Sequence, residues 1–183
     1  MPKYFINASN IKLGGGLVLL NDILECYCGP QKIHLVISDL LKGKILKNKY
    51  ITPIFISASL YNRLLFDFKL RKQLGPKDRI LVFGNLPPLL RFNCMVIVFM
   101  QNRLILEKLS SFNLSICIQK IWFRVFHFNS DVYYVQSEIM KLLLESFIQR
   151  TGKFVTFPFY NSRNKIESKK DSLIDFIYPA SDL

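Results

Sequence analysis

The apolar residues of this chain fall into short bursts that glycine, proline, asparagine or charged residues bound. Bursts rich in Val, Ile and Phe, such as 79–83 and 94–100, have the length of buried strands. Between the bursts lie longer segments in which apolar residues recur every three or four positions, as in packed helices. This pattern predicts strands at residues 3–8, 32–38, 51–57, 79–83, 94–100, 132–135 and 154–157, and helices at 15–28, 60–74, 111–128 and 138–151.

Strands that are apolar on both faces and alternate with helices indicate a parallel sheet covered on both sides. We therefore expect an α/β fold, a Rossmann-like, doubly wound and mostly parallel sheet with helices on both faces. No apolar run approaches the ~20 residues that a membrane-spanning helix needs, so the chain should not cross a bilayer. Its first residues lack the pattern of a signal peptide, which favours a cytoplasmic location.

The composition changes towards the end of the chain. Residues 158–171 are polar, basic and rich in Asn and Ser, as in a linker, and 173–178 are apolar again. We therefore expect one Rossmann-like domain over residues 1–159, a linker over 160–172 and the start of a truncated second domain over 173–183.

The chain carries 25 Lys and Arg against 13 Asp and Glu, a formal net charge of +12. Unless it only solvates the surface, this excess predicts a polyanionic partner, which is a phosphate-bearing ligand, an anionic membrane surface or nucleic acid. No recognised DNA- or RNA-binding motif appears, so we expect no nucleic-acid partner. One function that the charge leaves open is that of a non-enzymatic basic module that binds an anionic membrane or nucleic acid.

Three glycines, Gly14, Gly15 and Gly16, fall where the first strand hands over to the first helix. Glycines at this point allow backbone amides to approach a phosphate at the helix N-terminus, although they also suit a plain turn. The run is neither a dinucleotide-binding nor a Walker motif. A nucleotide-dependent oxidoreductase is therefore a weaker interpretation of the function. Such an enzyme carries an acidic residue at the end of its second strand, and Asp39 does follow that strand, but the glycine turn does not fit.

Polar residues follow several predicted strands at their carboxyl ends, where ligands bind in an open parallel sheet. Amides and a guanidinium at these points can hold sugar hydroxyls and phosphate oxygens. The competing interpretation is helix capping and loop hydrogen bonding, which we favour for Ser137. The candidate sugar-binding residues are Asn85, Pro87, Gln101, Asn102, Arg103 and Gln136.

Other reactive residue types give no catalytic pattern. We interpret His34 and His127 as packing or capping residues, because neither has a partner carboxylate at a recognisable spacing. Cys26 and Cys28 have a spacing that suits neither a zinc site nor a redox pair. We expect no metal and no cofactor, and the catalytic residues stay unassigned.

Segments spread over nearly the whole chain resemble, in the right order, the N-terminal part of group 1 (family 4-like) bacterial glycosyltransferases, which build cell-surface polysaccharides such as O-antigen. The segments are Tyr4–Ile11, Gly14–Gly16, Phe83–Pro88, Val98–Arg103, Val135–Ser137 and Phe176–Ser181.

This resemblance implies a two-domain GT-B fold and a hexosyltransferase activity of the retaining type. The N-terminal domain would hold a lipid-linked or saccharide acceptor, and Gly14–Gly16 would face the cleft near the donor phosphate. The C-terminal domain would bind the nucleotide-sugar donor, so we expect the chain alone to be nearly inactive. Many relatives carry a His-Asp pair where this chain has Gln101 and Asn102, which leaves the catalytic role of that position open.

The resemblance also suggests why the chain is basic, since such enzymes meet their acceptors at the anionic inner membrane. Segment 60–74 carries Leu64, Leu65 and Phe68 at helical spacing, with Lys and Arg between them. Each well-placed basic residue near such a surface contributes roughly 1 kcal/mol. We therefore expect a peripheral membrane protein whose membrane-facing residues are Arg63, Lys69, Arg71 and Lys72.

Overall fold

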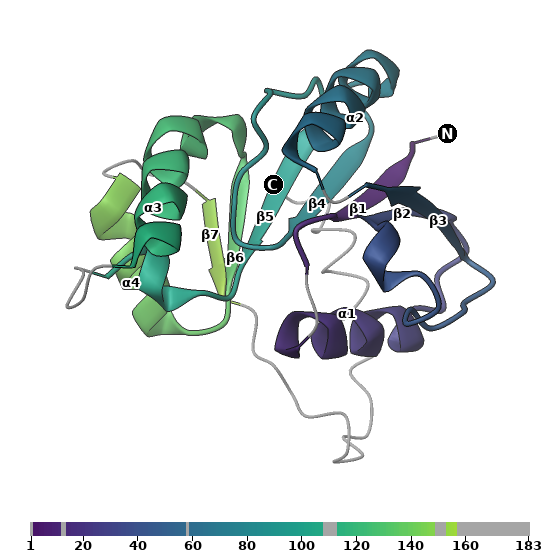
Figure 1. Ribbon diagram of the computed structural model, residues 1–183, viewed down its shortest axis with the longest axis horizontal. Helices are drawn as coiled ribbons and strands as arrows, with labels where there is room; N and C mark the ends of the chain where they lie inside the picture. The colour runs from purple at the N-terminus through teal and green to yellow at the C-terminus, as the bar shows by residue number, and fades with distance from the viewer. Residues whose placement is uncertain (1, 12–13, 58, 108–112, 149–152, 157–183) are drawn as a thin grey trace.

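The computed structural model describes residues 2–11, 14–57, 59–107, 113–148 and 153–156. Its centre is a seven-stranded sheet with the order β3-β2-β1-β4-β5-β6-β7, in which every neighbouring pair is parallel (Figure 1). The predicted parallel α/β sheet is confirmed. The strands are β1 (Tyr4–Ala8), β2 (Ile33–Ser38), β3 (Ile51–Ile56), β4 (Arg79–Phe83), β5 (Met95–Met100), β6 (Val132–Val135) and β7 (Lys153–Thr156).

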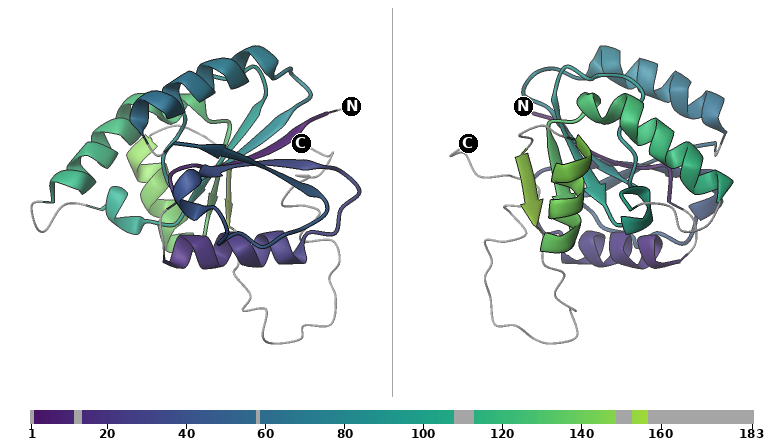
Figure 2. Two further views of the ribbon diagram at one scale, coloured as in Figure 1. Left: turned by 45° about the vertical axis from the view of Figure 1, so that its right-hand side comes forward. Right: turned by 90° about the vertical axis from the view of Figure 1, so that its left-hand side faces the viewer.

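Helices cover both faces of this sheet, as expected for a doubly wound fold (Figures 1 and 2). Helix α1 packs on one face, and helices α2, α3 and α4 pack on the other. The α-helices are α1 (Gly15–Cys26), α2 (Leu60–Gln73), α3 (Leu114–Phe126) and α4 (Glu138–Ile148). Short 3-10 helices lie at η1 (Asp39–Leu41), η2 (Arg103–Ile105) and η3 (His127–Asn129).

The strands bury side chains on both sides, so the core has two layers. Alternate residues of a strand point to opposite faces. On the first face, Phe83 and Phe99 belong to the same cluster as Leu24 of α1. On the second face, strand residues such as Val98 belong to the same cluster as Leu70 of α2, Phe123 of α3 and Leu144 of α4.

Side-chain caps fix where three of the helices begin. Ser59 and Asn113 accept hydrogen bonds from the backbone N–H groups three residues on, each at 3.2 Å. Ser137 does the same for the N–H of Met140 at 3.3 Å. Such caps satisfy N–H groups that have no partner within the helix. The prediction that Ser137 is a helix cap is confirmed.

Helix α1 ends earlier than the sequence pattern indicates, at Cys26 instead of residue 28. The amide of Asn48, far along the chain, donates to the carbonyls of Leu24 at 2.7 Å and Tyr27 at 2.8 Å. These are carbonyls that a helix end leaves without an internal partner. A long-range contact therefore sets this boundary, which local periodicity does not reveal.

Helix α2 packs on the sheet through a different face from the one its apolar spacing indicates. Leu70 is buried against the sheet, whereas Leu65 and Phe68 are exposed. The inward face also carries Asp67, which is buried, and Arg63, which is half-buried. Polar residues on the buried side obscure the amphipathic pattern, and they line a pocket.

The predicted linker at 160–172 and the predicted second-domain start at 173–183 lie outside the described residues. These two boundaries stay predictions. Within the described residues, no helix has both the length and the apolar character needed to span a bilayer.

Burial of Phe83 should dominate the stability of the first core layer. Its ring is fully buried and stacks on Phe99 with 5.1 Å between ring centroids. We expect Phe83→Ala to lower the free energy of unfolding by about 3–5 kcal/mol, because it leaves a cavity. Phe68→Ala on the exposed side of α2 should change it by about 0.5 kcal/mol or less. Urea unfolding measures both, and equal losses would contradict this description of the core.

Candidate functional site

The sheet has one switch point, between β1 and β4, where the strand order reverses along the chain. From β1 the chain runs outward through β2 and β3, and from β4 it runs the other way. Ligands of such sheets bind in the crevice outside the carboxyl ends of the strands at this point. The candidate site is therefore built from the loops that follow β1 and β4.

These two loops touch each other at Asn10 and Gly84. A Cβ placed on Gly84 would lie 2.9 Å from the Cβ of Asn10, closer than real Cβ atoms approach. Gly84 also has a φ of 148°, which disfavours other residues. Only glycine allows the two loops to meet in this way.

Asn85 connects the end of β4 to the end of β5. It adopts a positive φ of 73°, and its side-chain oxygen accepts hydrogen bonds from the N–H groups of Gln101 at 2.5 Å and Asn102 at 2.8 Å. Asparagine is among the few residues that tolerate this backbone conformation. The side-chain oxygen of Asn85 therefore holds the loops, which is the competing interpretation given above for this residue.

A pocket of about 100 Å³ opens beside these loops, on the face of the sheet that α2 and α3 cover. Its polar wall comes from the end of β1 and from α2, and its apolar wall comes from the loop after β4 and from α3. The lining residues are Asn7, Ser9, Asn10, Arg63, Asp67, Val82, Leu86, Pro87, Pro88, Leu89 and Trp122.

Arg63, which the sequence predicts as a membrane-facing residue, is half-buried and lines this pocket. Its Nη1 donates a hydrogen bond to Oδ1 of Asn10, and its buried Nε finds no hydrogen-bond partner among the described residues. Burial lowers the pKa of Arg63 from its ordinary value, and Asp67 opposes that shift. A guanidinium remains charged under such conditions. The pocket therefore offers a cation with an unused donor.

Asp67 lies one turn further along α2 and is 7% exposed. Burial raises the pKa of its carboxyl to about 7, and the nearby Arg63 reduces this effect. The carboxyl therefore changes protonation state near neutral pH, so it can either donate or accept a hydrogen bond in the pocket.

The apolar wall is held in place by hydrogen bonds to backbone carbonyls. Trp122 donates from Nε1 to the carbonyl of Pro87 at 2.9 Å. Asn129 donates to the carbonyls of Pro88 at 2.9 Å and Leu89 at 3.0 Å. Pro87, predicted as a site residue, thus lines the pocket and positions the indole ring. A pocket that joins an aromatic wall to convergent polar groups is typical of small-molecule sites.

The glycine turn lies at the start of α1, on the other face of the sheet. Gly14 has a φ of 119°, and its carbonyl accepts the first helical hydrogen bond from Leu17 at 3.0 Å. A Cβ on Gly16 would lie 3.6 Å from Oε1 of Gln101, so two residues predicted separately are neighbours. Nε2 of Gln101 is buried and finds no partner within the described part of the chain. This amide and the glycine backbone could both bind one ligand group.

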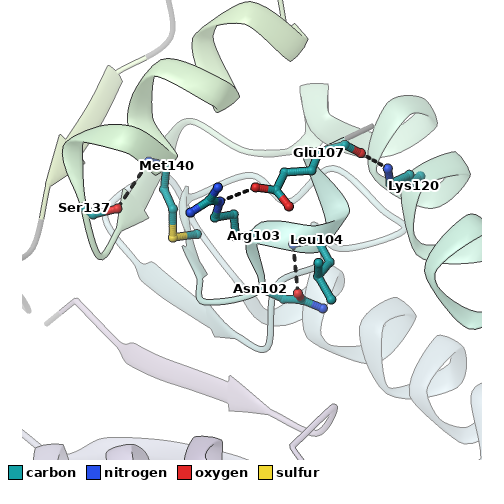
Figure 3. Close-up of polar contacts among 7 residues, drawn as sticks. All are labelled: Asn102, Arg103, Leu104, Glu107, Lys120, Ser137 and Met140. Atoms are coloured by element: carbon teal, nitrogen blue, oxygen red, sulfur yellow. Dashed lines mark hydrogen bonds and ion pairs between the residues drawn. The ribbon is translucent and has the colours of Figure 1, made fainter. Parts of the chain in front are cut away.

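The other predicted residues near the end of β5 are engaged locally (Figure 3). Oδ1 of Asn102 accepts from the N–H of Leu104 at 3.1 Å and caps η2. Arg103 forms an ion pair with Glu107 and is turned towards it (Figure 3). Gln136 is half-buried at the end of β6. The structure therefore does not bring these three side chains into the pocket.

Lys69, Arg71 and Lys72 are exposed on the second half of α2, so their placement agrees with the predicted membrane-facing role without testing it. His34 is half-buried, and its ring stacks on Phe5 with 4.8 Å between centroids. Burial and the neighbouring Lys3 lower the pKa of His34. Among the described residues, no group of three or more His, Cys, Asp or Glu side chains is placed to hold a metal ion.

No known protein family and no curated protein matches the chain. Among solved structures, the chain is similar to the N-terminal domain of Candida albicans trehalose-6-phosphate phosphatase, with a TM-score of 0.53 and 11% sequence identity. The match covers 87% of this chain and 48% of the matched chain, so this chain spans about half the length of the matched one. At this identity the likeness shows a shared α/β fold alone.

The role of Asn85 as a loop connector can be tested by substitution. Asn85→Ala removes the acceptor of two N–H groups and strains the backbone, so we expect a loss of about 2–4 kcal/mol of stability. Asn85→Gly tolerates the positive φ and should lose less. Urea unfolding of both variants measures the difference. If Asn85→Ala is as stable as the unsubstituted chain, the connector role is wrong.

Burial of Asp67 should make stability depend on pH. The folded-state pKa of about 7 lies above the ordinary value of 3.8, so the folded state binds more protons between these values. Stability should therefore fall as pH rises from about 4 to 7, by on the order of 4 kcal/mol. Asp67→Asn should remove this part of the dependence and be the more stable form at pH 8. If the free energy of unfolding changes with pH in the same way for both proteins, Asp67 is not a buried ionisable group.

Proposed function

We propose that this chain is the acceptor-binding domain of a GT-B glycosyltransferase. The enzyme would transfer a sugar from a nucleotide-sugar donor to a lipid-linked or saccharide acceptor in cell-surface polysaccharide synthesis. The observation that carries the proposal is the pocket at the switch point between β1 and β4. The α/β fold and the family resemblance of the sequence give it context.

The chemistry of the pocket suits a sugar. Arg63, Asp67 and Asn10 offer a charged donor, a carboxyl and an amide, which together match the mixed donor and acceptor character of hydroxyl groups. Trp122 and Leu89 supply apolar surface for the faces of a sugar ring. A pocket of about 100 Å³ that is open on one side accommodates one end of an acceptor.

The glycine turn would lie on the donor side of the site. Apart from chain neighbours and the backbone of α1 itself, no described atom lies within 4 Å of a Cβ placed on Gly14 or Gly15, so a phosphate can approach this backbone. The unused amide of Gln101 beside Gly16 adds a donor there. Most of the positive charge that stabilises a departing diphosphate would come from a second domain, so the chain alone should not catalyse transfer. The proposed reaction includes no metal ion and no cofactor.

Docking on an anionic membrane would use the outer side of α2. Leu65 and Phe68 are exposed there, and Lys69, Arg71 and Lys72 follow on the same helix. Apolar and basic side chains together favour binding at the surface of an anionic bilayer. Arg63 is not part of this contact, because it lines the pocket.

A glycosyl-transfer assay tests the proposal. It compares this chain with the same chain extended through the coding sequence downstream of Leu183, using a panel of sugar nucleotides and membrane extract. We expect transfer by the extended form alone. In that form Arg63→Ala should lower kcat/KM roughly 10- to 100-fold, because a hydrogen bond to a charged group is worth about 1.5–3 kcal/mol.

Arg91→Ala is the matched control. Arg91 pairs with Asp131 just before β6, and neither residue lines the pocket. Its loss should leave transfer unchanged. Absence of transfer by both forms would favour the alternative, a non-enzymatic basic module. If Arg91→Ala lowers kcat/KM as much as Arg63→Ala does, the pocket is not part of the acceptor site.

A further inference from the structure

Helix α3 exposes a line of large apolar side chains along its outer face. Leu114, Ile118, Ile121 and Val125 are each between 49% and 64% exposed. Their spacings of four, three and four residues place them on one side of the helix. This is the spacing of the seam through which two helices pack in a coiled coil.

The opposite side of α3 is also apolar, because it packs on the sheet. Phe123 is fully buried, and its ring meets Tyr133 of β6 and Phe147 of α4 with centroid distances of 5.7 Å and 5.5 Å. A helix that is apolar on both sides is normally buried on both sides. The outer face of α3 therefore lacks a cover among the described residues.

The neighbouring helix α4 extends this apolar surface. Ile139 and Leu142 are exposed and lie on the same line of α4 as Ser146. An open groove of about 430 Å³ separates Ser146 from Ile121 of α3. The groove is lined by Leu106, Glu107, Lys120, Ile121, Arg124, Ser146 and Phe147.

The chemistry of this face differs from that of α2. On α2 the exposed apolar residues are followed by Lys69, Arg71 and Lys72, which suits an anionic membrane surface. The α3 seam itself contains no charged residue. Lys120, beside it, donates to the backbone carbonyl of Glu107 and so is turned towards η2 (Figure 3). An uncharged seam at coiled-coil spacing favours a protein partner over a lipid surface.

We propose that the α3–α4 face is the interface through which two copies of this chain form a dimer, with the two α3 helices antiparallel. This inference does not rest on the proposed glycosyltransferase function. In an antiparallel pair, seam residues meet in layers formed by unlike positions of the repeat. Leu114 packs against Val125 of the second copy, and Ile118 packs against Ile121 of the second copy. Each contact occurs twice, as a two-fold axis requires.

The position of Arg124 favours the antiparallel arrangement over the parallel one. A parallel pair would place the two Arg124 residues at the same level along the helix axis. In the antiparallel pair Arg124 lies level with Ser115 of the second copy. The two arginines are then about 13 Å apart along the helix axis. That separation exceeds the screening length of about 8 Å at physiological salt.

The exposed apolar area is large enough for the centre of a dimer interface. Leu114, Ile118, Ile121 and Val125, with Ile139 and Leu142 of α4, each expose roughly 100 Å² of apolar surface. A stable interface buries about 800 Å² per partner, of which a large part is an apolar centre surrounded by a polar rim. These side chains provide that centre, and the groove receives side chains from the second copy.

Sedimentation equilibrium of the full chain tests the proposal. We expect a mass of twice 21.4 kDa at micromolar concentration, with an association that strengthens as salt screens the +12 charge of each copy. Ile121→Glu should weaken the association at least tenfold. Val18→Glu is the matched control, because Val18 is equally exposed on α1, and it should leave the dimer intact. Circular dichroism checks that both variants fold, and Ile118→Ser provides a milder second test.

Cross-linking tests the direction of the helices. In a background in which the exposed Cys26 and Cys28 and the half-buried Cys117 are replaced by Ser, a mixture of Ile118→Cys and Ile121→Cys chains should form a disulfide-linked pair more readily than either chain alone. A monomeric chain, or a dimer that Ile121→Glu leaves unchanged, would overturn the proposal. A chain that stays monomeric but binds anionic vesicles, with Ile121→Glu abolishing this binding, would overturn it in favour of a membrane contact on α3.

Discussion

The parallel pairing of β1 with β4 is the constraint on which the rest of this structure depends. Residues 4–7 of β1 pair with residues 79–82 of β4, so the two strands end at the same edge of the sheet. The chain leaves β1 and β4 in opposite directions, which brings the loop at Asn10 against the loop at Gly84. Both strands are buried on both faces, so helices must cover both faces, and the pocket forms beside the loops that follow the two strands.

The sequence predicts the fold well wherever local pattern decides it. Strands β4 and β6 begin and end where their apolar bursts do, because polar residues or glycine bound them on both sides. The pattern fails where a distant residue sets the end of a helix, or where the buried face of a helix carries both polar and apolar residues. Asn48 ends α1 early through two hydrogen bonds to carbonyls, and Asp67 occupies the buried side of α2, where periodicity indicates an apolar residue.

The site was predictable only in part, because it forms from segments that strand order brings together. The rule that ligands bind at carboxyl strand ends locates the right edge of the sheet. It does not show that Gln101 lies beside Gly16, or that Asn85 uses its oxygen to hold two backbone amides. Arg63 and Asp67 carry the one sequence signal that could have pointed to the pocket. They are an opposite-charge pair one helical turn apart in a segment that otherwise carries only positive charge.

The pocket lies between the two helices whose outer faces we propose as contact surfaces, and this links them to the site. Arg63 and Asp67 come from α2, and Trp122 comes from α3. A membrane held against α2 would bring a lipid-linked acceptor close to the pocket entrance. A second copy held against α3 would restrict motion of the helix that positions Trp122, whose indole already binds the Pro87 carbonyl. The two surfaces lie on different helices, and both helices contribute residues to the pocket.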